Sequence, residues 1–291
     1  MENDVKRESL RETAAVRSQA THNSSARLPS ADASSAENIV TNVAAPGEAK
    51  MHDIGNFTMK DMAECSGALR TMAAGATSME ETANRIVRYL YDHFLDGKTG
   101  RQAFVLARLF KTHFYDELDE ELRAAARNMI GASSPPPSMK CLVLLATAGA
   151  RPEWNFRRNS QGHKVIPLPS EQFVNRVPMV RQLVQQLGLE IKTLLEPDPK
   201  VIMDLTQKTY NVFYVPDAVG NEYVPAQKEF VVPFGVRSVI GFGGMLPSGN
   251  LYTTILFSRA HVPPETAEMF KTLALSIGIA LLSFVSGRVF G

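Results

Sequence analysis

The segment from Phe230 to Ser258, FVVPFGVRSVIGFGGMLPSGNLYTTILFS, constrains the fold more than any other part of the chain. Two apolar runs flank PSGN at 247–250, and these four residue types are typical of a tight turn between antiparallel strands. The segment therefore predicts a β-hairpin. One of its strands carries several glycines, which indicates either close packing under a helix or room for a ligand against the sheet.

The rest of the chain predicts helices and strands around this hairpin. Apolar residues at helical spacing, capping signals and prolines predict helices over 59–73, 78–94, 119–130 and 170–188, a break at Pro178, a short helix from Asp198 and Pro199, and a final helix from Pro264. Apolar runs of strand length predict strands over 102–110 and 141–149, and a strand or extended segment over 211–215. Adjacent hairpin strands with helices gathered at both ends favour an antiparallel sheet covered by helices, which is an α+β fold.

Composition and charge narrow the classes of function. The chain has 31 basic and 30 acidic residues and a net charge of +1, whereas a nucleic-acid partner needs a concentrated basic face. The only cysteines, Cys65 and Cys141, provide no disulfide framework, which favours a reducing, cytoplasmic compartment. No secretory signal is predicted, because the charged N-terminus MENDVKRESL has no apolar core.

Two further stretches define the ends of the predicted domain. Residues 1–50 are rich in Ser, Ala, Asn and charge and lack Phe, Trp and Tyr, so we expect a disordered tail followed by order from about Phe57. The longest apolar run, 273–285, is shorter than the roughly 20 residues of a membrane span. That run instead predicts a buried or dimer-facing helix.

Several residues around the hairpin resemble a known family. GVRSVIGF at 235–242, a turn with a glycine, and LYTTILFS at 251–258 resemble the C-terminal half of GAF domains. NVFYVPDA at 211–218 is similar to the strand and loop that precede this half, and LATAG with GHKVIPLPS is similar to the second and third strands of the family. The resemblance covers 57–287, and it is strongest over 209–258.

The resemblance implies a GAF-like sheet whose N- and C-terminal helices pack as a bundle. It also implies a non-enzymatic, cytoplasmic, signal-sensing module, similar to those at the front of bacterial histidine kinases and diguanylate cyclases. Such a module binds a small molecule and relays occupancy through a dimer helix to a signalling partner in trans. The alternative is a ligand-free module of the same fold for protein–protein interaction or dimerisation.

The loop PEWNFRRNSQGHK contains the first group of candidate ligand-binding residues, Trp154, Arg157, Arg158 and His163. Loops on rigid scaffolds often carry binding groups, and an aromatic ring beside guanidinium groups could recognise an anion or a planar ring. The structural alternative is favoured: Trp154 closes one end of the sheet, and the arginines lie in solvent.

The second group of candidates belongs to the region of the hairpin. We expect a cavity lined by Tyr210, Phe213, Tyr214 and the 235–245 strand, which includes Phe242. Arg237, at the start of that strand, could anchor an anionic ligand. Its favoured role is structural, either paired with Glu229 or Asp217 or extended into water.

No catalytic or metal site is predicted. GFGG at 241–244 differs from G-x-G-x-x-G and precedes no helix, so it does not predict a nucleotide site. The six histidines lack metal-site spacing, and no G-x-S-x-G elbow is present. The motifs of the bilin-binding, cyclic-nucleotide-binding and methionine-sulfoxide-reducing GAF subsets are missing. The sequence identifies no cofactor. It leaves open haem held by a single histidine, but it selects no histidine for that role.

The two terminal helices are expected to form a homodimer interface. The last helix is apolar on more than one face, and a methionine-rich stripe runs along 59–72. A second apolar face is commonly buried against a partner, and methionines suit a helix–helix contact. We expect Ile277 and Leu281 to lie in that interface.

Overall fold

The computed structural model describes residues 50–131, 134–160, 162–200 and 202–291. Residues 1–49 of the expected disordered tail lie outside the described residues. The chain divides into Met1–Gly47 and Glu48–Gly291, and every element below belongs to the second unit. Its first element lies before Phe57, because β1 (His52–Asp53) pairs with β2 (Phe94–Asp96) in a small sheet completed by β3 (Arg101–Gln102).

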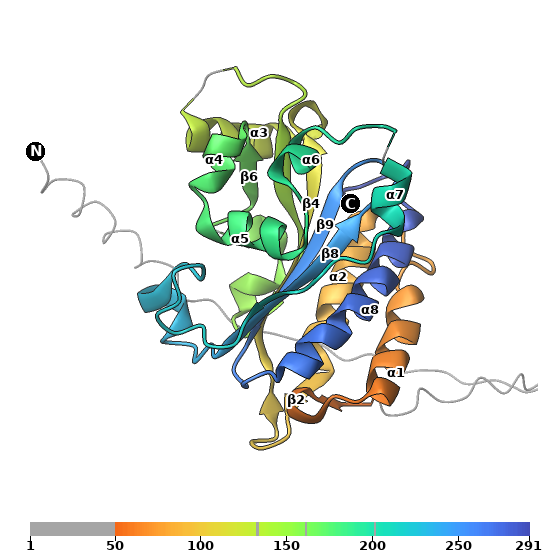
Figure 1. Cartoon of the computed structure of the whole chain (residues 1–291), viewed down its shortest axis with the longest axis vertical. Helices are drawn as coiled ribbons and strands as arrows, with labels where there is room; N and C mark the ends of the chain where they lie inside the picture. The colour runs from red at the N-terminus through yellow and green to blue at the C-terminus, as the bar shows by residue number, and fades with distance from the viewer. Residues whose placement is uncertain (1–49, 132–133, 161, 201) are drawn as a thin grey trace, which may run out of the picture. The chain divides into compact units, whose positions relative to one another are not determined.

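The main sheet has six antiparallel strands in the order β6-β5-β4-β9-β8-β7, so the mixed α+β class is confirmed (Figure 1). The two long strands at its centre, β4 and β9, are hydrogen-bonded to neighbours on both sides and are almost wholly buried. The strands are β4 (Phe104–Phe114), β5 (Lys140–Gly149), β6 (Val165–Leu168), β7 (Phe213–Val215), β8 (Ser238–Met245) and β9 (Leu251–Ser258).

The predicted hairpin is present as β8 and β9, joined at 246–250. The Leu246 N–H donates to the Asn250 carbonyl at 2.9 Å, and Gly249 has φ +71°, a left-handed conformation that glycine adopts without strain. The prediction of strand is wrong for 230–237, where the chain forms a helical turn, η5 (Gln227–Val231), and a bend. Pro233 has no N–H to donate there, and Gly235 is also left-handed.

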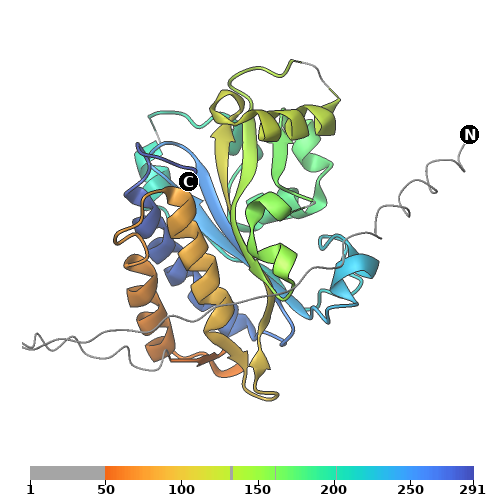
Figure 2. The same cartoon turned by 180° about the vertical axis from the view of Figure 1, so that it is seen from behind.

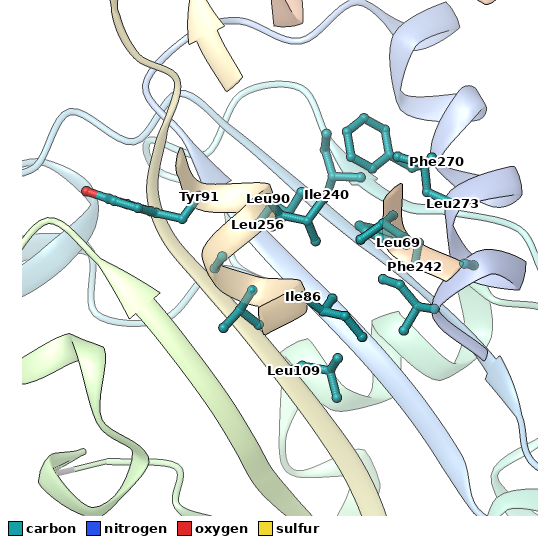
Figure 3. Close-up of a cluster of buried hydrophobic side chains, with 14 of the residues drawn as sticks. Leu69, Ile86, Leu90, Tyr91, Leu109, Ile240, Phe242, Leu256, Phe270 and Leu273 are labelled. Carbon is teal, nitrogen blue, oxygen red and sulfur yellow. The ribbon is translucent and has the colours of Figure 1, made fainter. Parts of the chain in front are cut away.

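Three helices cover the first face of the sheet: α1 (Met59–Arg70), α2 (Met79–Asp92) and α8 (Pro264–Leu282). Figure 2 shows the two N-terminal helices and α8 together on this side. α1 lies against α8, so the N- and C-terminal helices pack together as expected. Their side chains form one core with the sheet, and Figure 3 shows part of it, including Leu69, Ile86, Phe242, Phe270 and Leu273.

The second face is covered by short helices and a loop. Pro178 begins a new helix, so the predicted break is confirmed. The expected helix start at Asp198 is wrong: the Asp198 carboxylate accepts from the Lys200 N–H at 2.9 Å in a turn, and the described helix begins at Ile202. The helices here are α4 (Glu171–Asn175), α5 (Pro178–Gln186), α6 (Ile191–Leu195) and α7 (Ile202–Gln207). Elsewhere the chain forms α3 (Glu120–Ile130) beside β6, and the short turns η1 (Ile54–Asn56), η2 (Tyr115–Glu117), η3 (Pro152–Asn155) and η4 (Arg157–Asn159).

The assignment of Ile277 and Leu281 to a dimer interface is wrong. Both side chains are 0% exposed and belong to the core of the first face. Residues four apart on a helix share a face, and this pair faces the sheet. The exposed apolar stripe of α8 consists of Leu275, Ile279 and Leu282, at 44%, 47% and 46% exposure. Among the described residues, no helix combines the length and the apolar character that crossing a membrane requires.

Candidate functional site

A groove of about 470 Å³ lies on the second face of the sheet, opposite α1, α2 and α8. Strands β4, β5, β6 and β9 form its floor, the first turn of α5 forms one wall, and the 222–230 loop, which ends in the helical turn η5, forms another. Its volume is within the range of small-molecule sites. Most of its lining is apolar, and the apolar floor residues are Leu106, Phe110, Leu142, Ile166, Ile255 and Phe257.

Arg108, which is half-buried, is the one described cation on the floor of this groove, between Leu106 and Phe110 of β4. Its Nη2 lies 3.3 Å from Ser160 Oγ, and its Nε is buried without a hydrogen-bond partner among the described residues. No described carboxylate forms an ion pair with it. Desolvation lowers the Arg108 pKa to about 10, so the guanidinium keeps its charge at neutral pH.

Arg108 is not among the predicted ligand-binding residues, although the sequence contains a signal for it. The residue is the single charge within FVLARLF, a run that is otherwise apolar on both faces of a central strand. Buried charges are normally paired, since an isolated one is costly to desolvate. A lone arginine in a buried strand therefore indicates that its charge has a partner. On the floor of a groove, that partner is either a bound group or a neighbouring side chain.

One end of the groove is aromatic. Trp154, predicted to close one end of the sheet or to bind a ligand, packs against Phe234 and Phe230, with ring centroids 4.7 Å and 5.6 Å apart. The Arg151 guanidinium lies over the Phe234 ring at 4.9 Å. Trp154 is half-buried and faces the groove, so its fluorescence can report on the contents of the groove.

His163, one of the predicted ligand-binding residues, also lines the groove. Its backbone has φ +60°, a conformation that non-glycine residues seldom adopt and that often marks a functional loop. Desolvation, and then the positive charge of Arg108, lower the pKa of the imidazole. More than a third of the residue is exposed, so solvent screens part of this effect.

The cavity predicted around Tyr210, Phe213 and Tyr214 is not formed by these residues. Phe213 is fully buried in the core of the second face, whereas Tyr214 packs on the first face and donates to the Val262 carbonyl. Neighbouring residues of a strand point to opposite faces, so the two side chains cannot line one cavity. The Tyr210 hydroxyl donates to the Leu205 carbonyl at 2.6 Å, and desolvation raises its pKa to about 12.

Phe242 and Arg237 also lie away from the groove. Phe242 is buried on the first face, where its ring centroid is 5.1 Å from that of Phe270. The Arg237 side chain is exposed and forms no hydrogen bond or ion pair with another described residue, whereas its backbone N–H donates to the Ser258 carbonyl at 2.7 Å. Its favoured pairing with Glu229 or Asp217 is therefore absent among the described residues, and the side chain extends into water.

Arg157 and Arg158 of the 152–164 loop lie on a different surface from Trp154. The expectation that both lie in solvent is wrong for Arg157. Arg157 is buried and holds the Glu80 carboxylate with two bonds, Nε–Oε1 at 2.7 Å and Nη2–Oε2 at 3.2 Å. Its guanidinium also lies 4.6 Å from the Phe290 ring, so it ties the loop to the start of α2 and to the C-terminal segment. Arg158 is exposed and borders a solvent-open hollow beside that ion pair.

A second buried polar cluster lies where β4, β5 and the hairpin turn meet. Lys140 and Lys111 are 2% and 4% exposed, and desolvation lowers the pKa of each ammonium to about 8. The Lys140 ammonium donates to Asn250 Oδ1 at 2.6 Å and lies 4.0 Å from the Phe114 ring centroid. Lys111 has weaker partners, with its Nζ 3.3 Å from the Thr112 carbonyl oxygen.

One group of described residues has the composition of a metal site. Potential ligand atoms of His52, Asp61 and Glu64 lie within 4.8 Å of one another. The Lys50 ammonium already pairs with Asp61 at 2.8 Å and with Glu64 at 2.5 Å. Since the lysine supplies the positive charge that a metal ion would bring, this cluster gives no reason to propose a metal.

The two cysteines are separate, buried thiols. Desolvation raises the pKa of each to about 12, and the thiolate is the reactive form, so we expect neither to be nucleophilic. Replacing both with alanine should leave groove binding unchanged and cost about 1–2 kcal/mol of stability each, measured by urea unfolding. Rapid alkylation of either thiol in the folded protein would contradict this expectation.

Comparison with known proteins does not assign the chain to a family. No protein-family model matches it, and no curated protein matches it.

Proposed function

We propose that this protein is a non-enzymatic, cytoplasmic, signal-sensing module of the GAF type, which binds a small molecule in the groove on the second face of its sheet. The observation that carries the proposal is the combination of an apolar groove with the Arg108 guanidinium on its floor, which has no carboxylate partner among the residues that the structure describes. A groove of this size lined mainly by apolar side chains, with few polar groups, is typical of small-molecule sites.

The sheet provides a route from the groove to α8. Ile255 and Phe257 of β9 form part of the groove floor, while Tyr252 and Leu256 of the same strand point to the other face. The Tyr252 hydroxyl donates to the Ala274 carbonyl of α8 at 3.0 Å. At Gly278 an added Cβ would lie 2.5 Å from that hydroxyl, so helix and strand are in close contact. A shift of β9 on binding would therefore move α8.

The exposed stripe of α8 supports the rest of the proposal. We propose that Leu275, Ile279 and Leu282 pack against a second copy of the chain, and that the dimer helices pass occupancy of the groove to a signalling partner in trans. Three large apolar side chains along one helix face are costly to leave in water. A ligand-free interaction module of the same fold is the second candidate, and this same stripe is what favours it.

Native mass spectrometry of freshly purified protein separates the two candidates. We expect the wild-type chain to retain a small molecule in a fixed ratio. Val177→Phe should lose it, because Val177 is half-buried at the groove wall and a larger side chain there fills the space. The matched control is Val219→Phe, which changes an exposed residue outside the groove.

Each outcome of this experiment has a clear meaning. Retention by wild type and Val219→Phe, with loss in Val177→Phe, supports a ligand in the groove. Equal retention by all three places the ligand elsewhere and contradicts the proposed site. If the wild-type chain carries nothing and binds no compound from a small-molecule collection, the ligand-free alternative is favoured.

A further inference from the structure

The chemistry of the groove narrows the class of ligand. Arg108 lies in an apolar stripe, and its Nε has no partner among the described residues. Its one hydrogen bond within the described part of the chain, to the neutral Ser160 hydroxyl, is long at 3.3 Å and leaves the charge uncompensated. Arg108 is half-buried, so its uncompensated charge is only partly hydrated, whereas the guanidinium fork matches a carboxylate with two parallel bonds. The floor of the groove is thus suited to an anionic oxygen pair.

A second feature of the groove also favours an anion. The first turn of α5, at 177–180, forms its wall, and the residue before the helix, Val177, provides no side-chain cap. The first N–H groups of a helix have no intrahelical partner, and the helix dipole places partial positive charge at this end. Arg108 and the uncapped start of α5 come from different elements, and they give the same groove two groups that attract negative charge.

The remaining wall limits how much negative charge the ligand can carry. Glu222 and Glu229, both exposed, belong to the 222–230 loop that borders the groove. A phosphate group with two charges would be repelled by these carboxylates and would exceed the charge of Arg108. The apolar floor and the aromatic end formed by Trp154 and Phe230 match a hydrocarbon or aromatic body.

We propose, on the basis of the function proposed above, that the ligand is a small monocarboxylate with an apolar body, bound with its carboxylate on the Arg108 guanidinium beside the start of α5. The body of the ligand lies over the apolar floor, toward Trp154. Binding compensates this half-buried charge, so occupancy stabilises the groove as well as filling it.

Isothermal titration with matched probes tests this class. The probes are 4-phenylbutanoate and octanoate, their neutral primary amides, and phenyl phosphate as a dianion with an aromatic body. Trp154 fluorescence provides an independent readout, because it is the only tryptophan and lines the groove. We expect at least one acid to bind about 100-fold more tightly than its amide, since the amide leaves the guanidinium without a charged partner.

Variants of Arg108 then identify the contact. Arg108→Met should remove the preference for acid over amide, and Arg108→Lys should retain part of it, because an ammonium keeps the charge but not the fork. Arg176→Met is the matched control, since Arg176 is an exposed arginine just before α5 that does not line the groove. Thermal unfolding of the ligand-free variants checks that each is folded, and Arg108→Met should melt no lower than wild type.

The possible results distinguish a wrong ligand class from a wrong proposed function. Equal binding of acid and amide, unchanged by Arg108→Met, overturns the monocarboxylate class but leaves the groove as a binding site. Tighter binding of phenyl phosphate than of either acid overturns it as well. If no probe binds at millimolar concentration, the class is wrong, and the retained mass in the native spectrum decides whether the groove binds anything at all.

Discussion

Replacing Ile277 and Leu281 with aspartate should unfold the protein. Both side chains are fully buried between α8 and the sheet, in the cluster that also contains Phe242 and Phe270. A carboxylate placed there loses its hydration and finds no partner, and a change of this kind costs about 4 kcal/mol or more. Two such changes approach or exceed the total stability of about 5–15 kcal/mol that is usual for a domain. Circular dichroism should show loss of the folded signal at 25 °C.

The matched variant changes the other face of the same helix. Leu275→Glu with Ile279→Glu adds the same charge at two exposed positions, so we expect a folded, soluble protein. If α8 forms the proposed homodimer, light scattering should show a monomer for this variant and a dimer for wild type. A folded Ile277→Asp, Leu281→Asp protein would contradict the packing of α8. A Leu275→Glu, Ile279→Glu protein that stays dimeric would place the interface elsewhere.

Replacing Lys111 and Lys140 with methionine should stabilise the protein and flatten its pH dependence. In the folded chain each ammonium has a pKa near 8, against a normal value of 10.5. Above about pH 8 the folded state therefore binds fewer protons than the unfolded state, and the free energy of unfolding rises with pH. From pH 7 to pH 9 the rise should be about 1.4 kcal/mol for each lysine in wild type. The double variant removes this contribution.

Urea unfolding at a series of pH values measures this effect. The buried thiols act in the opposite direction, because their raised pKa in the folded state lowers stability above about pH 9, but they are common to both proteins. The difference between wild type and variant therefore isolates the lysines. Lys60→Met, at an exposed position, is the control and should leave the slope unchanged. A wild-type stability that falls steadily from pH 7 to pH 9 would contradict the assignment of two buried ammonium groups.

The fold was more predictable from the sequence than the candidate site. The hairpin at 238–258, the break at Pro178 and the terminal helices follow from local signals, namely turn residues, proline and helical spacing. The sequence did not show which apolar residues of α8 face the sheet. Ile277 and Ile279 are equally apolar, and only packing on the sheet distinguishes them.

The candidate site depends on contacts between distant segments. Trp154 and His163 line the groove, although the sequence did not predict a groove at this place. Phe213 and Tyr214 were predicted to line one cavity, but a strand sends adjacent side chains to opposite faces. Arg157 is an attractive binding residue until the fold brings Glu80 to it. The groove itself needs β4, α5 and the 222–230 loop together, and no single stretch of sequence contains that arrangement.

A crystal structure of the protein grown with 4-phenylbutanoate tests the central claim most directly. We predict density in the groove, with both carboxylate oxygens about 2.8 Å from Arg108 guanidinium nitrogens and the phenyl ring over the floor between β4 and β9. An empty groove in which the Arg108 guanidinium pairs with Glu222 or Glu229 would contradict it, because the Arg108 charge would then have a partner within the chain.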